Sequence, residues 1–325
     1  MRTRLMIAVT VGLLVLGWVV VRPAVVGAGV EEAGADRAVL FPFASADGAG
    51  GLRWGYMDDE GRTVITPQYD FAGVFSGGLG VVEVRGAAGY VDAAGDYVVR
   101  PTYRLNDADD TAARPLRGGR AAVRVGGAWG FIDAAGSLMI PPRYVGDDGA
   151  VVVGDFYDGL AWFRQPGVDG RADRYGFIDA AGEVVIEPRA WAVNDFGEGL
   201  AGHTRQGRWG FIDRRGREVV KPAFDGVGVF AGGLAPALKD GAWGFVDRRG
   251  RWSIDPRWSA VGGFSEGLAA VETETGWGFV DDRGELVLPA VYDAVLWFDG
   301  GLARVRKSGH WFYVDRAGLR VGPAW

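Results

Sequence analysis

The sequence contains no cysteine. Disulfide bonds, thiolate nucleophiles and cysteine-based zinc sites are therefore excluded, and an exported chain of this composition must be stabilised by its core alone. Histidine is also scarce, since His203 and His310 are the only two. A Ser/His/Asp triad would need one of them beside a nucleophile, and no nucleophile-elbow motif is present. We therefore expect neither histidine to be catalytic.

Lysine is scarce as well, and nearly all of the basic residues are arginine. Lysine occurs only at positions 221, 239 and 307, and the 325 residues carry a formal net charge of −6. Because phosphate neutralisation supplies most nucleic-acid affinity, a chain of this sign without a basic stripe is a poor candidate for nucleic-acid binding. A hydrophobic content of 48% with 23% charged residues indicates a globular protein. The 55 glycines show no Gly-X-Y period and predict many tight turns.

Only one long hydrophobic run is present, at residues 5–21, behind Arg2 and Arg4. Its length lies between the core of a signal peptide and a membrane-spanning helix. Small residues at 26–28 are suited to signal peptidase, so a cleaved signal peptide and a retained membrane anchor are both consistent with the segment. In either case the two arginines should stay in the cytoplasm and the rest of the chain should cross the membrane. The prediction is an extracytoplasmic protein, anchored by this segment or secreted.

A motif recurs eight times along the remaining chain: Trp-Gly-aromatic-aliphatic-Asp, two further residues, then Gly. The copies begin at Trp54, Ala88, Trp129, Tyr175, Trp209, Trp243, Trp277 and Trp311. Their starts are separated by 34, 41, 46, 34, 34, 34 and 34 residues. A dominant fixed period of this length indicates a tandem-repeat architecture.

Each unit reads as a set of short antiparallel strands. In "VVKPAFD" (219–225) and "FAGGLAPAL" (230–238), as in the motif itself, runs of aromatic and aliphatic residues are bounded by Gly, Asp and Pro. The Asp-x-x-Gly segment is typical of a hairpin loop, because Asp accepts backbone N–H bonds and Gly takes positive φ. We predict a three-stranded meander per unit, with the Tyr-Asp segment as a candidate for a short fourth strand.

The central strand is non-polar on both faces. Trp243 and Phe245 point to one side, and Gly244 and Val246 to the other. A meander of this size cannot bury two faces alone, so neighbouring units must cover it. We expect the glycine to let an aromatic side chain of the next unit approach closely.

The predicted fold class is all-β, with eight tandem antiparallel β-meander units of about 34 residues. A closed propeller-like ring is favoured, because it leaves only short protected edges. An open β-solenoid is the alternative, since 34 residues is short for a propeller blade of about 40–45. In a solenoid, residues 37–43 and the final "VGPAW" would be caps; in a ring, residues 37–43 would be the first strand of the first unit.

The Trp-Gly dipeptide, the Asp-x-x-Gly segment, Pro-x-Tyr-Asp and Phe-x-x-Gly-Leu-Ala together resemble the WG-repeat family (WG beta repeats) of bacterial proteins. The resemblance covers roughly residues 38–321, with Ala88 and Tyr175 in place of Trp and Phe312 in place of Gly. It implies tandem β-units, often exported or attached to other domains, that serve as binding or scaffolding surfaces. It supplies no catalytic residues.

The repeated aspartates are the most numerous candidate site residues: Asp58, Asp92, Asp133, Asp179, Asp213, Asp247, Asp281 and Asp315. Metal ligation and acid catalysis are one interpretation. Identical placement in every unit favours turn chemistry instead, because an active site usually occurs once per fold. The tryptophans of the Trp-Gly pairs are likewise interpreted as core residues.

Insertions distinguish the second and third units, near residues 104–115, 144–155 and 164–173. Extra loops often lie on the working face of a repeat protein. They carry many acids, namely Asp107, Asp109, Asp110, Asp147, Asp148 and Asp155. Calcium or a basic partner segment bound through these oxygens is one hypothesis, and solvated surface loops without EF-hand spacing are the other.

Aromatic residues outside the motif, namely Trp162, Trp191, Trp252, Trp258 and Trp297, suggest either a sugar- or peptide-binding surface or packing between units. The leading prediction is a binding or scaffold protein without catalysis, and the alternative is a cell-wall or carbohydrate binder. A propeller-type glycoside hydrolase would need one non-repeating carboxylate pair, and the sequence marks none. We expect no cofactor and no metal. The predicted division is a signal or anchor at 1–29, a linker at 30–37 and the repeat domain at 38–325.

Overall fold

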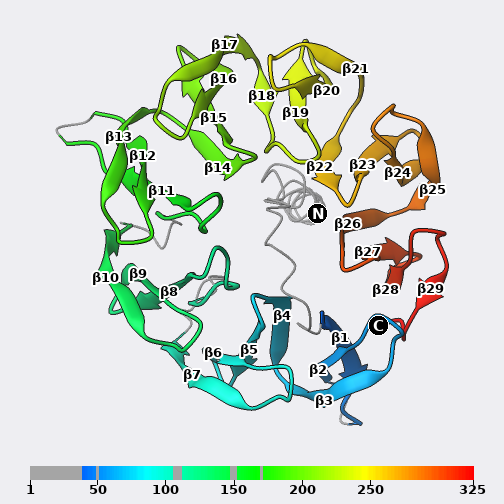
Figure 1. Cartoon of the computed structure of the whole chain (residues 1–325). Helices are drawn as coiled ribbons and strands as arrows, with labels where there is room; N and C mark the ends of the chain where they lie inside the picture. Colours follow the sequence, from blue (N-terminus) through cyan, green and yellow to red (C-terminus); the bar gives the residue numbers. More distant parts are fainter. Residues whose placement is uncertain (1–38, 49–50, 105–111, 147–151, 169–170) are drawn as a thin grey trace, which may run out of the picture.

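The strands form eight small antiparallel sheets arranged around a closed ring (Figure 1). The computed structural model describes residues 39–48, 51–104, 112–146, 152–168 and 171–325. These residues contain β-strands, turns and bends and no helix. The all-β class and the propeller-like ring are confirmed, and the molecule is an eight-bladed β-propeller rather than an open solenoid.

Each blade is contiguous in the sequence, and the first half of the ring contains blades 1–4. Blade 1 comprises β1 (Phe41–Ala46), β2 (Leu52–Met57) and β3 (Thr63–Tyr69). Blade 2 comprises β4 (Phe71–Ser76), β5 (Leu79–Val84), β6 (Ala87–Val91) and β7 (Tyr97–Arg104). Blade 3 comprises β8 (Ala121–Val125), β9 (Ala128–Ile132) and β10 (Leu138–Val145), and blade 4 comprises β11 (Leu160–Gln165), β12 (Arg174–Asp179) and β13 (Val184–Ala190).

Blades 5–8 complete the ring. Blade 5 comprises β14 (Val193–Gly197), β15 (Leu200–Arg205), β16 (Arg208–Asp213) and β17 (Glu218–Phe224). Blade 6 comprises β18 (Gly226–Val227), β19 (Leu234–Lys239), β20 (Ala242–Asp247) and β21 (Trp252–Trp258). Blade 7 comprises β22 (Val261–Ser265), β23 (Leu268–Thr273), β24 (Gly276–Val280) and β25 (Leu286–Tyr292), and blade 8 comprises β26 (Ala294–Asp299), β27 (Leu302–Lys307), β28 (His310–Val314) and β29 (Arg320–Val321).

The Tyr-Asp segment does supply a fourth strand, and it lies innermost in the blade (Figure 1). It is formed as β4, β14, β18, β22 and β26. In blades 3 and 4 its place is marked by isolated bridges, Ala113 with Val123 and Val153 with Phe163. Blade 1 has no such strand among the described residues, so β1 is its innermost one.

The glycine of each Trp-Gly pair faces the outer strand of its own blade. In blade 6, Trp243 pairs with Trp258 and Phe245 with Ile254, so three residues of β21 lie opposite Gly244 alone. A β-carbon on Gly244 would lie 2.5 Å from the carbonyl oxygen of Ile254. The expectation that this glycine admits an aromatic ring from the next unit is therefore wrong. It admits the bulged backbone of the neighbouring strand.

The outer strands of the ring contain proline, which limits their pairing with other strands. The outer strands β3, β7, β10, β13, β17 and β21 contain Pro67, Pro101, Pro142, Pro188, Pro222 and Pro256. Proline cannot donate a ladder hydrogen bond and is tolerated on edge strands or at bulges. Each of these prolines lies in the bulged segment, and the perimeter is thereby protected from pairing with other strands.

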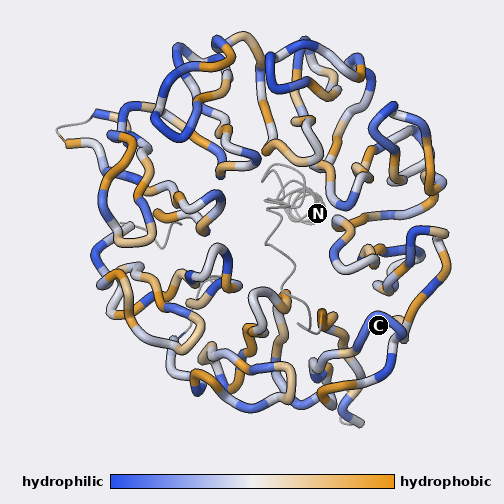
Figure 2. Tube along the Cα trace, viewed as in Figure 1, coloured by the Kyte–Doolittle hydropathy of each residue, from blue (hydrophilic) through white to orange (hydrophobic). Residues whose placement is uncertain are grey.

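Aromatic pairs join successive blades, as the dependence of each unit on its neighbours requires. The central strand of one blade contributes Phe245, and the innermost strand of the next contributes Phe264, with ring centroids 4.8 Å apart. The same edge-to-face or tilted packing is present in the pairs Tyr56–Phe75, Phe131–Phe156, Phe177–Phe196, Phe211–Phe230 and Phe279–Phe298. Hydrophobic residues accordingly recur in every blade (Figure 2). Such pairs contribute roughly 0.5–1.5 kcal/mol beyond area burial.

The seam between blades 8 and 1 closes through the same contact, made by a different residue. Tyr313 of β28 packs against Phe41 of β1, with ring centroids 5.4 Å apart. Phe41 pairs with Met57, the position at which other blades have the alanine or glycine of Gly-Leu-Ala. Its larger ring takes the place of the innermost-strand phenylalanine that blade 1 lacks. The Tyr313 hydroxyl donates to the carbonyl oxygen of Pro42 at 3.0 Å.

The last residues complete blade 8 and are not a cap. Trp325 exchanges two backbone hydrogen bonds with Trp311, at 2.9 and 3.0 Å, and Val321 pairs with Tyr313. The four-residue step from Val321 to Trp325 matches the step from Ile254 to Trp258 in the bulged outer strand of blade 6. The Trp325 ring reaches across the seam to Trp54, with centroids 6.3 Å apart. The N-terminal residues 37–43, proposed as the first unit's initial strand or a cap, include the start of strand β1.

The predicted leader lies outside the described residues, which begin at Val39. Among the residues that the structure does describe, no helix is long and apolar enough to cross a membrane. The signal or anchor at 1–29 and the linker at 30–37 stay predictions.

Candidate interaction surfaces

Turns and connections fall on two faces of the ring, because the strands of each blade alternate in direction. We call the upper face the one that carries the connections between blades and the turn between the second and third strands of a four-stranded blade. The lower face carries the turn between the first and second strands and the Asp-x-x-Gly turns. Any surface that binds a partner is built on one of these faces, on the perimeter or along the ring axis.

The repeated aspartates are turn residues, as their identical placement predicts. Oδ1 of Asp247 accepts backbone N–H bonds from Arg249 at 2.8 Å and Arg251 at 3.0 Å, and the N–H of Gly250 donates to the Asp247 carbonyl oxygen. The same pair of carboxylate bonds is made by Asp58, Asp92, Asp133, Asp179, Asp213, Asp281 and Asp315. The glycine that follows has a positive φ in all eight turns. Each of these carboxylates fixes the conformation of its own turn on the lower face.

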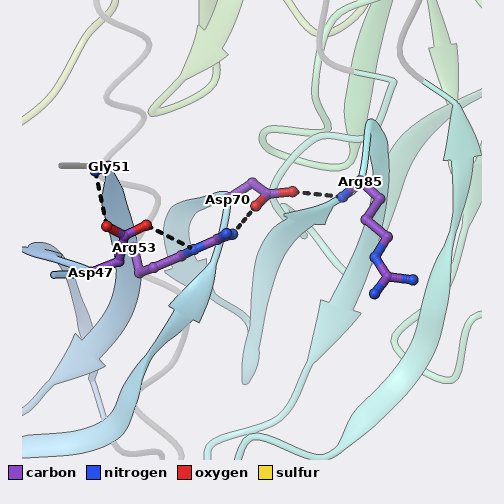
Figure 3. Close-up of polar contacts among 5 residues, drawn as sticks. All are labelled: Asp47, Gly51, Arg53, Asp70 and Arg85. Atoms are coloured by element: carbon purple, nitrogen blue, oxygen red, sulfur yellow. Dashed lines mark hydrogen bonds and ion pairs between the residues drawn. The ribbon is translucent and has the colours of Figure 1, made fainter. Parts of the chain in front are cut away.

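A second set of aspartates holds the upper face. The Asp70 carboxylate accepts the backbone N–H of Arg85 in the next blade at 2.6 Å and is ion-paired with Arg53 (Figure 3). The Arg85 side chain points away from Asp70 (Figure 3). Asp225 repeats the arrangement with Arg208 and the N–H of Asp240. An aspartate at the end of an outer strand therefore fixes the nearest turn of the following blade.

Carboxylates also link neighbouring blades on the lower face. Glu198, in the first turn of blade 5, accepts a hydrogen bond from the N–H of Gly233 in blade 6 at 3.0 Å. Arg248, in the Asp-x-x-Gly turn of blade 6, donates to the Glu198 carbonyl oxygen at 2.5 Å. Its guanidinium also lies 3.7 Å from the Glu198 carboxylate. We call this arrangement the lower-face latch.

The full latch recurs at one other junction, and its bond from a glycine N–H to the acid recurs at a second. Glu266 of blade 7 accepts the N–H of Gly301 at 3.1 Å, and Arg316 of blade 8 donates to the Glu266 carbonyl oxygen. Asp158 of blade 4 accepts the N–H of Gly199 at 2.6 Å. Each acidic residue is followed one blade later by an arginine directly after the turn aspartate, in the pairs Asp158/Arg214, Glu198/Arg248 and Glu266/Arg316. Where glycine replaces the acid, the second residue is alanine or aspartate: Gly77/Ala134, Gly118/Ala180, Gly232/Asp282 and Gly300/Asp59.

The three insertions all enter and leave the ring on the upper face. Two of them are connections between blades, after β7 and after β10, and the third joins β11 to β12. Most of their acids, including Asp107 to Asp110 and Asp147 to Asp148, lie outside the described residues. Asp155 is described, and it forms an ion pair with Arg114 at 3.1 Å. Within the described ranges, no group of three or more His, Cys, Asp or Glu residues is placed to hold a metal ion.

The two histidines lie in different blades and in different environments. His203 is buried in β15, opposite Gly210, where other blades have Val, Ala or Phe. Its Nε2 lies 3.8 Å from a Glu218 carboxylate oxygen that also pairs with Arg205 at 2.9 Å. Burial lowers the pKa of His203 below its ordinary value, and Glu218 opposes this shift. His310 is exposed, and its ring nitrogen Nδ1 lies 3.1 Å from a backbone carbonyl oxygen.

Tryptophans of both kinds serve mainly in packing. Of those in the Trp-Gly pairs, Trp129 and Trp277 are buried, and Trp54, Trp209 and Trp243 pack against core clusters. Among the others, Trp258 is buried, and Trp162, Trp252 and Trp297 are partly exposed. Trp191 differs, because it is 57% exposed on the upper face with the Arg174 guanidinium 5.5 Å from its ring centroid.

A partly buried arginine, Arg304, occupies the seam. The Arg304 guanidinium carbon lies 4.8 Å from the Trp311 ring centroid, 5.3 Å from that of Trp325 and 5.6 Å from that of Trp54. Burial lowers the pKa of Arg304, although a guanidinium remains charged in proteins. Cation–π contacts with rings from both blades stabilise the closed ring here.

Comparison with known proteins agrees with this architecture. The family model for the WG containing repeat matches residues 54–86, 129–167, 175–202, 209–241, 243–274 and 277–311. These segments make up more than half of the chain, which therefore belongs to the WG-repeat family. No protein among those with curated functions matches the sequence.

Solved structures resemble the chain in fold alone. The crystal structure of a eukaryotic initiation factor is 10% identical, with a TM-score of 0.53 over 89% of this chain and 85% of that one. The dihydro-heme d1 dehydrogenase NirN in complex with DHE is 13% identical, with a TM-score of 0.53 over 90% of this chain and 75% of that one. At such identities neither activity transfers to this protein.

Proposed function

We propose that this protein is an extracytoplasmic binding scaffold without catalytic activity, and that it engages a protein partner through the upper face of blades 2–4. Membership of the WG-repeat family and the propeller fold support a binding or interaction role. The observation that carries the choice of surface is that all three insertions depart from the upper face of adjacent blades. The predicted leader supports the location outside the cytoplasm and a membrane attachment limited to residues 1–29.

The non-catalytic part of the proposal rests on how the titratable residues are used. The repeated aspartates are occupied by backbone N–H groups of their own turns. The two histidines belong to blades 5 and 8, and the described contacts of neither include a hydroxyl group. No cofactor or metal is part of the proposed function.

The test is capture of envelope proteins by chemical cross-linking to the full-length chain. One variant has residues 105–111 and 147–151 shortened to the connection length of blade 5, and a control has a Gly-Ser pair inserted in the lower-face turn at Arg249. We expect the shortened variant to lose the cross-linked partners and the control to retain them. Equal capture by both would contradict the choice of face.

A second candidate function is binding of cell-wall polymer or carbohydrate, and exposed Trp191 is the observation that favours it. Its ring lies on the upper face beside the insertion between β11 and β12, and exposed rings stack on sugars. Retention on purified cell wall, abolished by Trp191→Ala and unaffected by Trp297→Ala, would favour this function over protein interaction.

A further inference from the structure

A cationic cleft lies on the outer side of blade 2, near the upper face. It has a volume of about 570 Å³ and is lined by Arg85, Tyr97, Arg100, Pro101, Thr102 and Arg104. Arg100, Thr102 and Arg104 are exposed and alternate with less exposed residues along β7. All three line the cleft, together with Tyr97 and Pro101. Arg85 comes from the adjoining turn between β5 and β6, so two elements converge on the cleft.

The positive charge of this cleft is not neutralised within the described part of the chain. Among the described residues, no carboxylate lines the cleft, and Arg85, Arg100 and Arg104 form no ion pair with any of them. The whole chain has a net charge of −6, so three arginines around one hollow do not reflect a general excess of cations. Arginines held together without a counter-charge repel one another, and an anionic ligand would relieve that repulsion.

Blade 2 differs from blades 1, 5 and 7 at the residue that ends its outer strand, Arg104. Arg104 occupies the site that in blades 1, 5 and 7 holds the aspartates Asp70, Asp225 and Asp293. Those aspartates accept backbone N–H groups from the following blade. In blade 2 the charge at this site is reversed, and the side chain is free to face the cleft.

The shape of the cleft suits an extended chain with alternating acidic groups. From Arg100 to Arg104 the strand spans up to roughly 13 Å at about 3.3 Å per residue. The Arg100 guanidinium carbon lies 6.0 Å from the Tyr97 ring centroid, which limits its freedom before any ligand arrives. Planar guanidinium groups bind carboxylates through paired hydrogen bonds. Tyr97 and Pro101 offer apolar surface between the charges.

We infer that this cleft, defined by Arg85, Arg100 and Arg104, binds an acidic peptide segment of the partner protein. The inference rests on the proposed protein-binding function and names the chemistry of the partner that this function requires. A peptide is favoured over an anionic polymer of sugar or glycerol phosphates, because the apolar lining fits side chains between the acids and such a polymer has no apolar groups to place there.

The test uses the full-length protein in a neutral detergent and a labelled heptapeptide in which glutamate alternates with leucine and serine. Fluorescence anisotropy measures its binding at low ionic strength. We expect the double variant Arg100→Gln/Arg104→Gln to bind at least about tenfold more weakly, because two charge-assisted contacts are lost. The matched control is Arg215→Gln/Arg249→Gln, which removes the same charge from exposed lower-face turns, and it should change binding less than about twofold.

Three further outcomes decide the inference. Binding should disappear when glutamine replaces glutamate in the peptide, and persistence would overturn the charge recognition. A glycerol phosphate oligomer of equal charge should bind more weakly, and tighter binding would overturn the peptide in favour of a polymer. The variant Asp107→Asn/Asp109→Asn/Asp110→Asn, next to Arg104 in sequence, should bind the peptide at least as tightly, whereas weaker binding would show that the ligand needs those acids.

Failure of this inference and failure of the proposed function can be told apart. If envelope partners still cross-link to the upper face while the peptide does not bind, only the acidic-peptide inference fails. If the peptide binds the cleft and no partner is captured, the proposed function fails.

Discussion

The glycine of the Trp-Gly pair acts at the scale of one residue. Three residues of the outer strand lie opposite Gly244, and their backbone occupies the space that a β-carbon would need. This bulge recurs in the register of the other blades, and even blade 8 keeps the four-residue step from Val321 to Trp325. The bulged backbone therefore fits against a central-strand glycine in most blades, and blade 8, which has Phe312 at this position, has an outer strand, β29, of only two residues.

Substitution of Gly244 by alanine tests this role. We expect a loss of about 2–3 kcal/mol in the free energy of unfolding, because a β-carbon 2.5 Å from a backbone oxygen cannot be relieved by a side-chain rotation. Urea denaturation followed by tryptophan fluorescence measures the loss. The control is Gly263→Ala in β22, where no atom lies within 4 Å of the new β-carbon and φ is not positive. A similar loss in both variants would refute the backbone clash.

Protonation of His203 should make the free energy of unfolding depend on pH. Its pKa is lowered in the folded state by burial, so the unfolded chain binds the proton more readily. The penalty is absent above the ordinary histidine pKa of about 6.5 and grows as the pH falls below it. Glu218 and Arg205 face the ring, and Glu218 reduces the shift.

We therefore expect His203→Val to flatten the loss of stability between pH 7.5 and pH 5. Valine occupies the equivalent position in blades 7 and 8, at Val271 and Val305, so the fold should tolerate it. Urea midpoints at both pH values measure the effect. His310→Gln is the control for loss of a histidine, because His310 is exposed at the start of β28. A slope unchanged in the His203 variant would show that other groups dominate.

At the scale of the element, the sequence predicted strands and turns well and strand number less well. Asp-x-x-Gly carries its own turn chemistry, so all eight hairpin loops could be placed from local residues alone. The innermost strand was only a candidate, because its length depends on the neighbouring strand. β18 has two residues, and it pairs with a strand containing Pro236, which has no N–H to donate. The bulge opposite Gly244 was missed because periodicity does not reveal a change of register.

The candidate surfaces were predictable only in part. The inserted loops were visible as breaks in the 34-residue period, and their common face follows from strand direction. The lower-face latch and the cationic cleft were missed, since their residues meet only across blades or across a strand and a turn. A signal was present in both cases: acids and arginines co-occur in successive units, and Arg104 stands where blades 1, 5 and 7 have aspartate.

The lower-face latch can be tested by a double-mutant cycle at blades 5 and 6. Arg248→Asp beside intact Glu198 should destabilise the protein, whereas Glu198→Gly/Arg248→Asp recreates the Gly232/Asp282 combination of blades 6 and 7. Because Arg248 is half exposed, we expect a coupling of about 0.5–1 kcal/mol. Glycine at position 198, where φ is positive, should by itself raise the free energy of unfolding. The double-mutant cycle subtracts this separate contribution, so that only the coupling between the two positions remains. Arg249→Asp replaces Arg248→Asp in a control cycle, and coupling of equal size there would contradict the latch.

At the scale of the whole molecule, closure depends on a seam without a shared strand. Blades 8 and 1 each form a separate sheet, and side chains join them. Phe41, Phe43 and Met57 of blade 1 pack with Leu302 and Tyr313 of blade 8. The choice of ring over solenoid could not be derived from the repeat, because a repeating unit specifies its contact with the next copy and not the angle that brings the eighth to the first.

Phe41→Ala tests the seam. We expect a loss of about 3–5 kcal/mol, because the ring of Phe41 is buried and replaces the innermost-strand aromatic of every other junction but one. Phe71→Ala, at a residue 36% exposed, should cost markedly less. Chemical denaturation measures both. Equal losses would show that the seam contributes no more than an ordinary surface contact.

The seam described above also bears on how such a ring changes over generations. Since every blade is one uninterrupted stretch of chain, duplication or deletion of a single 34-residue repeat adds or removes a whole blade and leaves the strand order of the others unchanged. Only the residues that meet at the junction of first and last blades, Phe41 and Trp325 among them, must then adapt to the new circumference. The similar segments "GRWGFIDRRGREVVKP" and "GAWGFVDRRGRWSIDP" of blades 5 and 6 are what a copying event of this kind would leave behind.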